Sequence, residues 1–408
     1  MHIEGGNITI NCAAIAAKGI KAAGDIFISD EPVIDITTTG KGEWDEEDQE
    51  TNAACGISAD GDIDISGGTL TLTATGSGGK GMKCDSVLTI SGGDIAVSTS
   101  GGLYYNNGTT ENTNYTANTD SVSSDYYSSP KGIKAGVKTQ VGNSYTYSGG
   151  LVVSGGKVKV TTTGYNSEGI ESKNYLNITG GEIYINAYDD GINSAQDMTI
   201  EGGYIYSHSD NNDGTDANGD VYLNGGLVYA SYSNGARTPE LGIDSYPEGG
   251  KKIYVNGGVI IAVGGIENDA VYNQPKIQQS NVSGNTWYTV TYDDNVIAFK
   301  TPTISTGGGP EGPGGPGGPG GNSGGLVVSA PSTPSIATGN NVTDSTSYFE
   351  GNCYVGRGTL GIDDVETGQQ IVNDPRVFTI DGRYLGTEVP ATFRGVYIQN
   401  GKKHVKLQ

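Results

Sequence analysis

Four copies of one short motif in the middle of the chain decide the fold. They are Val153-Ser154-Gly155-Gly156-Lys157-Val158, Ile178-Thr179-Gly180-Gly181-Glu182-Ile183, Ile200-Glu201-Gly202-Gly203-Tyr204-Ile205 and Leu223-Asn224-Gly225-Gly226-Leu227-Val228. Each copy places two apolar residues five positions apart, on either side of a Gly-Gly pair. Inward-facing residues of one strand are an even number apart, so the odd spacing indicates a turn between two strands. Glycine adopts backbone angles that other residues avoid, and we therefore predict a corner at each pair.

The same unit recurs along residues 3–260, and a second signal, Gly-Ile or a near variant, recurs in phase with it. Each unit therefore holds three short strands and two fixed corners, while its third connection varies in length. A period of 20–50 residues with three short strands is typical of a stacked solenoid and too short for the four-stranded blades of a propeller. We predict an all-β fold, a right-handed parallel β-helix of about nine rungs.

The composition agrees with this prediction and excludes several classes of protein. The chain of 408 residues has 64 Ile and Val but only 13 Leu, which favours strands over helices. The formal net charge of −23 argues against nucleic acid as a partner. Four cysteines without a CxxC pair predict neither a disulfide scaffold nor a zinc site. The sequence has no apolar run long enough for a membrane-spanning helix.

Changes in composition divide the chain into four parts. Residues 1–302 form the predicted β-helix with capping strands at its end, residues 303–325 a Gly/Pro-rich linker or loop, residues 326–360 return strands, and residues 361–408 a small C-terminal β module. Met1 falls inside a repeat unit, so we expect a truncated N-terminus whose export signal is missing.

Most long insertions fall in one connection of the repeat, and we expect them to stack along one side. The insertion at residues 98–131 is rich in Tyr and Asn, and aromatic faces and amide groups both suit sugars. Tyr104 and Tyr105 are therefore candidate sugar contacts, with ordinary loop residues as the alternative. The insertion at residues 37–56 carries Trp44 among acidic residues, and we expect it to be a solvated tip.

Charged residues beside the Gly-Ile signal form a ladder that changes sign along the chain. Like charges one strand spacing apart repel, so each block needs a counter-charge. For the lysines this is an acidic sugar, solvation or the acidic loop, and the candidate ligand-binding residues are Lys21, Lys83, Lys131 and Lys134. For the acidic block the sequence predicts Ca²⁺, which prefers several oxygen ligands, with a salt-screened acidic face as the alternative. The candidate metal ligands are Glu168, Glu171, Asp189, Asp190, Asn193, Asp210, Asp213, Asp216, Asp220 and Asp244.

The repeated corners, the Lys-Gly-Ile-Lys and Asp-Asp-Gly-Ile-Asn rungs and the stretch 296–302 resemble a bacterial carbohydrate-binding β-helix family. The resemblance covers residues 1 to about 355 and implies a fold similar to pectate lyases. It also implies bound calcium and binding to cellulose and to acidic sugars such as polygalacturonate. The last 45 or so residues resemble a Bacteroidetes-type sorting module, which implies export to the cell surface.

Three other functions stay open at this point. A calcium-dependent polysaccharide lyase needs a basic residue at the reacting carbon, and Arg237 is its candidate because Arg237-Thr238-Pro239 resembles part of an Arg-x-Pro element of pectate lyases. A glycoside hydrolase needs two carboxylates on facing sides of a cleft, a separation that sequence does not fix. A structural surface adhesin needs no sugar specificity. We favour a secreted or cell-surface bacterial protein that binds plant cell-wall polysaccharides without cleaving them.

Overall fold

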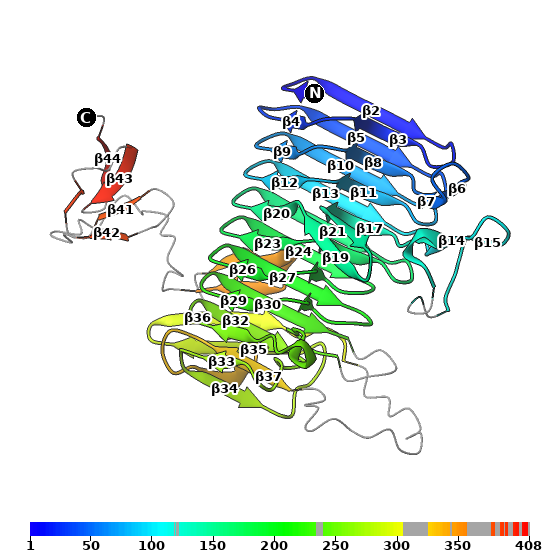
Figure 1. Ribbon diagram of the computed structural model, residues 1–408. Coiled ribbons are helices and arrows are strands. Elements are labelled where there is room, and N and C mark those ends of the chain that lie inside the picture. The colour runs from blue at the N-terminus through cyan, green and yellow to red at the C-terminus, as the bar shows by residue number, and fades with distance from the viewer. Residues whose placement is uncertain are drawn as a thin grey trace, which may run out of the picture. The chain divides into compact units, whose positions relative to one another are not determined.

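A computed structural model describes residues 1–117, 119, 122–233, 240–304, 325–342 and 345–356, together with short stretches between 377 and 406. The chain divides into two compact units, Met1–Gly358 and Thr359–Gln408. In the first unit the chain passes through three sheets in turn, and one strand in each sheet makes up a rung (Figure 1). We name these sheets A, B and C.

Sheet A has ten parallel strands: β1 (His2–Ile3), β4 (Ile26–Ile28), β9 (Ile63–Ile65), β12 (Val87–Ile90), β20 (Gly150–Val153), β23 (Tyr175–Ile178), β26 (Met198–Ile200), β29 (Val221–Leu223), β31 (Ile253–Val255) and β33 (Val271–Tyr272). Sheet B follows each corner and contains β2 (Asn7–Cys12), β5 (Val33–Thr38), β10 (Thr69–Ala74), β13 (Asp94–Thr99), β21 (Lys157–Thr162), β24 (Glu182–Ala187), β27 (Tyr204–Ser209), β30 (Leu227–Tyr232) and β32 (Val259–Val263). Two antiparallel strands extend it, β37 (Leu326–Ser329) and β34 (Lys276–Gln279).

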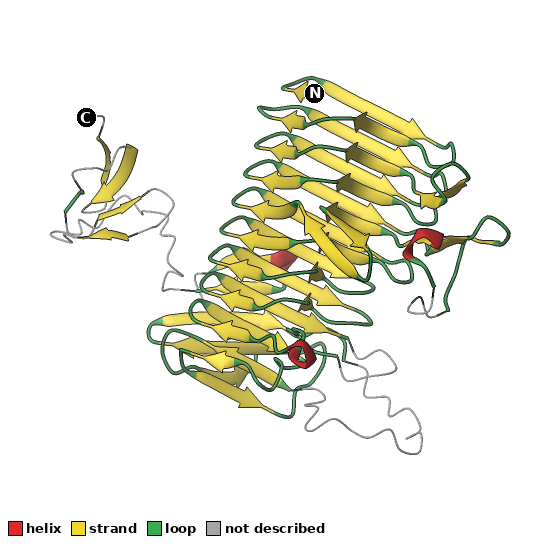
Figure 2. Ribbon diagram, in the orientation of Figure 1, coloured by secondary structure: helices red, strands yellow, loops and turns green. Residues whose placement is uncertain are grey.

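Sheet C is the shortest of the three and carries the Gly-Ile signal. Its strands are β3 (Lys18–Ala22), β8 (Cys55–Ala59), β11 (Lys80–Cys84), β17 (Lys131–Ala135), β22 (Glu168–Ser172), β25 (Ile192–Ser194) and β28 (Thr215–Ala217). All pairs of neighbouring strands in sheet C are parallel. The predicted all-β, three-sheet arrangement is thus present, whereas the right-handed winding stays a prediction (Figure 2).

The Gly-Gly pairs form the corner between sheets A and B, as the spacing predicts. The second glycine has a positive φ, for example +78° at Gly156 and +90° at Gly181. In the one unit without glycines, Asp30 adopts φ +59° at the same corner. The glycine of the Gly-Ile signal is required for a different reason: a Cβ on Gly169 would lie 2.5 Å from the carbonyl oxygen of Gly191 in the next rung.

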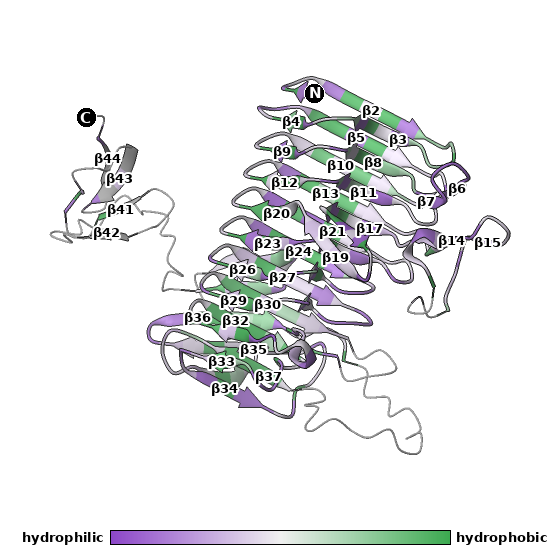
Figure 3. Ribbon diagram, viewed as in Figure 1, coloured by the Kyte–Doolittle hydropathy of each residue, from purple (hydrophilic) through white to green (hydrophobic). Residues whose placement is uncertain are grey.

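The core consists of columns of aliphatic side chains that stack from rung to rung. Figure 3 shows the matching hydrophobic stretches, in green, along the strands of successive rungs. In sheet C, Met82, Ile133, Ile170 and Ile192 follow one another in register and are each at most 1 % exposed. Each such side chain contributes about 1.5–3 kcal/mol when it is fully buried. Equivalent inward-facing positions of successive rungs are therefore occupied by the same few aliphatic residue types.

Strands β35 (Trp287–Tyr292) and β36 (Asn295–Lys300), which the sequence predicts as capping strands, belong to a sheet separate from A, B and C. With β38 (Ser335–Thr338), β39 (Thr346–Tyr348) and β40 (Cys353–Val355) they form an antiparallel sheet, the cover sheet, against the outer face of sheet B. Tyr229 on that face packs against Phe299 with ring centroids 5.8 Å apart. The physical reason is a row of outward-facing tyrosines on sheet B, which would otherwise expose apolar surface.

Short insertions complete the first unit: β6 (Glu43–Asp45), β7 (Glu50–Asn52), β14 (Tyr104–Asn106), β15 (Glu111–Asn112), the 3₁₀ turn η1 (Ser124–Tyr126), β16 (Tyr127–Ser128), β18 (Val137–Val141), β19 (Ser144–Ser148), η2 (Pro247–Gly249) and η3 (Phe349–Gly351). The second unit holds an antiparallel sheet of β42 (Tyr384–Gly386), β41 (Val377–Thr379), β43 (Gly395–Gln399) and β44 (Lys402–Lys406). Most of the predicted linker at 303–325 lies outside the described residues. Within them, no helix has the length and apolar character to cross a membrane.

Candidate functional site

The inner lysine column, Lys18, Lys80 and Lys131, lies at the start of the sheet C strands and holds the chain's own loops. Lys18 Nζ donates to the carbonyl oxygens of Ala16 and Ala53, and so holds the end of the loop that carries Trp44. Lys80 Nζ donates to Ser128 Oγ at 2.6 Å, at the end of the tyrosine-rich loop. Burial lowers the pKa of Lys80 well below its usual value.

Lys131, a candidate ligand contact, is buried and paired with the first acidic residues of the ladder. Its Nζ lies 2.7 Å from a Glu168 oxygen and 3.6 Å from Glu171, which also binds Lys173. Burial alone would lower the pKa of Lys131, but the two carboxylates raise it above the ordinary value. Burial beside Glu171 raises the pKa of Glu168 to about 7. Glu168 and Glu171 are thus paired with lysines, while one buried oxygen of each has no hydrogen-bond partner among the described residues.

The outer lysine column, Lys21, Lys83 and Lys134, lies in the register that the sequence predicts. Lys21 pairs with Asp60 and Lys83 with Asp85, both at 2.9 Å and at least partly exposed. Lys134 follows next, and among the described residues no carboxylate lies within ion-pair distance of it. Burial, only partly offset by Glu171, lowers the pKa of Lys134 to about 8. The outer column is therefore the part of the lysine ladder that faces the surface.

Three of the predicted metal ligands come together near the end of sheet C. Each of Asp213, Asp216 and Asp244 offers an oxygen within 4.8 Å of the others. Burial and mutual repulsion raise the pKa of Asp213 well above the usual value, while burial raises that of Asp216 to about 6 and that of Asp244 to about 8. One buried oxygen of Asp244 has no hydrogen-bond partner within the described residues. The group has the donor type and spacing that a hard cation uses.

Two further candidates adjoin this acidic group. Asp190 accepts a hydrogen bond from the Asp213 backbone N–H at 3.1 Å and another from the Asn193 amide at 2.9 Å. Its carboxylate therefore shapes the loop in front of the group rather than lying within it.

The remaining candidates lie elsewhere. Asp220 lies at the start of a sheet A strand and accepts a hydrogen bond from the Lys252 N–H at 2.9 Å. Asp210 lies 3.5 Å from His208 Nε2, beyond the end of β27. Asp189 lies between the two blocks, because it interacts electrostatically with Lys131 and also with Asp190 and Asp216. Arg237, the candidate base of a lyase, lies outside the described residues.

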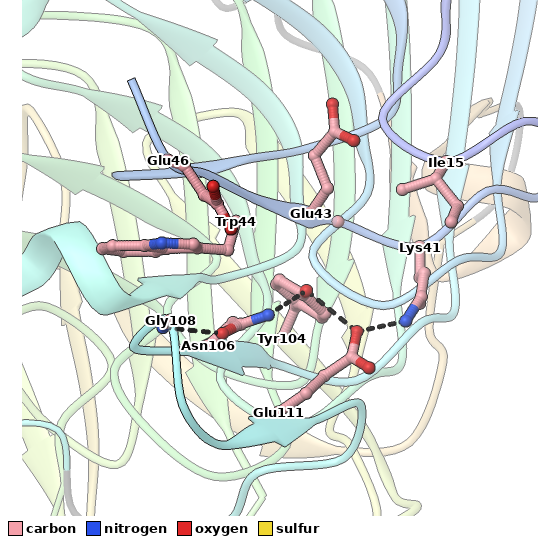
Figure 4. Close-up of a pocket in the computed structure, with 10 residues that line it drawn as sticks. Ile15, Lys41, Glu43, Trp44, Glu46, Tyr104, Asn106, Gly108 and Glu111 are labelled. Carbon is pink, nitrogen blue, oxygen red and sulfur yellow. Dashed lines mark hydrogen bonds and ion pairs between the residues drawn. The ribbon is translucent and has the colours of Figure 1, made fainter. Parts of the chain in front are cut away.

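A pocket that the sequence did not predict forms where the two long insertions meet. Its volume is about 290 Å³, and it is lined by residues of both insertions and by Ile15: Lys41, Gly42, Glu43, Trp44 and Glu46 from the first, and Tyr104, Asn106, Gly108 and Glu111 from the second (Figure 4). Trp44 packs against Tyr126 with ring centroids 5.7 Å apart, so the two insertions support each other. The sequence predicts their stacking on one side and a solvated acidic tip. Residues 46–50 are exposed, as a solvated tip would be, but Trp44 before them forms part of a pocket wall.

The floor of the pocket is a chain of hydrogen bonds. The Asn106 amide donates to Tyr104 Oη at 3.0 Å, Tyr104 donates to Glu111 Oε1 at 2.9 Å, and Lys41 pairs with the same carboxylate (Figure 4). Hydrogen bonds from Lys41 and Tyr104 lower the pKa of Glu111 and keep it ionised. The polar groups are therefore fixed before any ligand arrives.

The predicted aromatic contacts have different surroundings from those expected. Tyr104 is 1 % exposed, so its ring is buried in the pocket wall and is not open to stack on a sugar. One face of Tyr105 is covered by Tyr115, with centroids 4.7 Å apart. The aromatic ring in the pocket wall is Trp44, beside Gly108, where a Cβ would lie 3.0 Å from Trp44 Nε1. Gly42 similarly leaves room for Tyr104, since a Cβ there would lie 2.6 Å from the ring.

Comparison with protein families gives this arrangement a context. The model of a family described as carbohydrate-binding domain-containing protein matches residues 1–108 and 142–285. The chain belongs to this family. The match includes Lys41, Trp44, Tyr104 and Asn106, whereas Glu111 lies outside it. Searches among curated proteins and among solved structures found no match.

Family membership supports carbohydrate binding as the function of the chain. The part of the structure best suited to it is the pocket, because it combines an aromatic ring with fixed hydroxyl, amide and carboxylate groups. Sequence reasoning missed the pocket because its residues lie outside the repeat. The only available signal was the pairing of two long insertions in the same connection of the repeat.

Proposed function

We propose that the chain binds a polysaccharide, without cleaving it, along the side of the coil that carries the Trp44 pocket and the outer lysine column. The observation that carries the proposal is the pocket itself, where Trp44 offers apolar surface beside the fixed groups of Tyr104, Asn106 and Glu111. Sugar rings present an apolar face and a rim of hydroxyls, and this combination suits both. The pocket lies on the side of a long stack of rungs, which favours a polymer.

The charge state of Glu111 supports binding rather than hydrolysis in the pocket. A glycosidase needs a carboxylic acid that keeps its proton near neutral pH. The lowered pKa of Glu111 has the opposite effect, since Lys41 and Tyr104 both stabilise the carboxylate. Glu111 is therefore suited to accept hydrogen bonds from hydroxyl groups.

The acidic group at Asp213, Asp216 and Asp244 is the place where we propose bound Ca²⁺. Carboxylates with raised pKa values ionise readily only when a cation joins them, and a calcium ion accepts several oxygens at once. The ion would join β28 and the residues just before it to the segment around Asp244 in the next rung, where Ile243 pairs with Thr215. Its role would be to stabilise these rungs, with secretion or display at the cell surface as the setting.

Two classes of plant polysaccharide would bind to different surfaces of the chain. A uronate polymer such as polygalacturonate would use Lys83 and Lys134, and its binding would weaken as salt rises. Cellulose would depend on the Trp44 pocket, and salt would have little effect. If binding of either polymer depends on calcium, the acidic group contributes to that binding.

The test is a pull-down against cellulose, polygalacturonate and chitin, each with calcium and with chelator. We expect Trp44→Ala to weaken binding to at least one polymer about tenfold or more, an amount within the range for losing an aromatic anchor. The matched control is Tyr145→Ala, an exposed aromatic residue on the β18–β19 hairpin. Absence of affinity for every polymer would favour the adhesin, and release of unsaturated uronides, which absorb in the near ultraviolet, would favour the lyase.

A further inference from the structure

The Trp44 pocket carries an excess of negative charge that the rest of the proposed binding surface lacks. Glu43, Glu46 and Glu111 line it, and Lys41 is the one basic residue in its wall. Lys41 is already paired with Glu111. The strand and turn that continue from Glu43 to Glu50 add further acidic residues, without a lysine or arginine among them.

These carboxylates are spread around the pocket rather than gathered at a point. Among the described residues, Asp213, Asp216 and Asp244 are the one group whose oxygens lie within 4.8 Å of one another, and this group is not at the pocket. A dispersed set of carboxylates does not form the close cage that calcium requires. It attracts instead a cation that is attached to a larger molecule.

The charge of the pocket repels one class of sugar and attracts another. A uronate would bring its carboxylate close to Glu43 and Glu46, and like charges at such a distance repel. A sugar that carries an ammonium group would meet two carboxylates that have no ion-pair partner among the described residues. The face of Trp44 also attracts cations, because the ring has a negative face.

We propose that the pocket binds an amino sugar unit with a free, protonated amine, as in a polymer of 2-amino-2-deoxyhexose. The inference rests on the proposed function and assigns a substrate class to its pocket. The ammonium group faces Glu43 and Glu46, the apolar face of the ring lies against Trp44, and the hydroxyls bond Asn106 and Glu111.

The test compares oligomers of glucosamine with the same oligomers after N-acetylation, which removes the charge and keeps the ring. Calorimetry should give affinity about tenfold higher for the free amine, and raised salt should reduce this difference. The double variant E43Q/E46Q should bind both oligomers equally. The matched control Glu31→Gln, an exposed residue at the corner between sheets A and B, should keep the preference.

Other outcomes overturn the inference in distinguishable ways. Equal binding of the two oligomers, or a preference for galacturonate oligomers that Trp44→Ala removes, would refute the amino sugar and leave polysaccharide binding standing. Equal binding of oligolysine would show a nonspecific acidic surface and would also refute it. Absence of binding to any saccharide would refute the proposed function as well. Circular dichroism of each variant checks that the fold is intact.

Discussion

The lysine half and the acidic half of sheet C occupy the same columns of the same repeat, yet they reach neutrality in different ways. In the lysine half, carbonyl groups, a serine and carboxylates of the chain surround the ammonium groups, as at Lys80 and Lys131. In the acidic half, Asp213, Asp216 and Asp244 adjoin one another without a described lysine or arginine within ion-pair distance. The chain itself therefore supplies most partners of the lysine half, and for the acidic half we propose that a cation from solution supplies the missing charge.

The largest effect is expected where the two halves meet. Lys131→Met should destabilise the fold by about 3–5 kcal/mol, because it leaves Glu168 and Glu171 buried with less positive charge. Urea denaturation measures this. The matched change Lys21→Met, at an exposed pair with Asp60, should cost about 1 kcal/mol or less. Similar losses in the two variants would contradict the distinction between inner and outer columns.

Calcium should stabilise the acidic half. At a concentration 100 times its Kd, an ion that binds only the native state adds about 2.7 kcal/mol, which thermal melting with calcium and with chelator would detect. Asp216→Asn should abolish the shift, whereas Asp220→Asn should retain it, since Asp220 lies at another corner. An unchanged midpoint in the original protein, with no metal found by elemental analysis, would refute the calcium site.

Lys134 tests whether the lysine half is fully neutralised. Its pKa falls from 10.5 to about 8 in the folded chain, so the unfolded chain holds the proton more tightly. Lys134→Met should therefore stabilise the fold by roughly 1–3 kcal/mol below pH 8, and the gain should shrink as pH rises from 8 to 10.5. Denaturation at pH 7 and pH 10 would show it. Lys138→Met, at an exposed position, is the matched control for the loss of a lysine.

The repeat itself could be predicted from sequence because its signals are local. The Gly-Gly corners and the Gly-Ile column fix which residues stack, and the register of Lys83 with Lys134 follows directly. The same register places Lys131 beside Glu168, so their ion pair could also have been inferred at the boundary between the blocks. The sequence prediction assigned a separate counter-charge to the lysine block and to the acidic block, and so it missed the ion pair between them.

Features that depend on the variable connections could not be predicted in the same way. Asp220 follows β28 by only a few residues, but the chain turns before it and places it on sheet A. The pocket depends on how two insertions pack against each other, as Trp44 does against Tyr126, and no periodicity specifies that contact. The cover sheet had a signal in the outward-facing tyrosines of sheet B, such as Tyr206 and Tyr229, which stack 4.7 Å apart.

The cover sheet also has a mechanical consequence. A solenoid in which each rung contacts only its neighbours can unfold one rung at a time from an end. Here Glu350 pairs with Lys159, and Tyr348 stacks on Tyr204 at 4.0 Å, so late residues fasten several middle rungs together. Under a pulling force, the rungs that neither the cover sheet nor the packed insertions at Trp44 and Tyr126 connect should peel away singly. Those beneath the cover sheet should yield together, as one cooperative block.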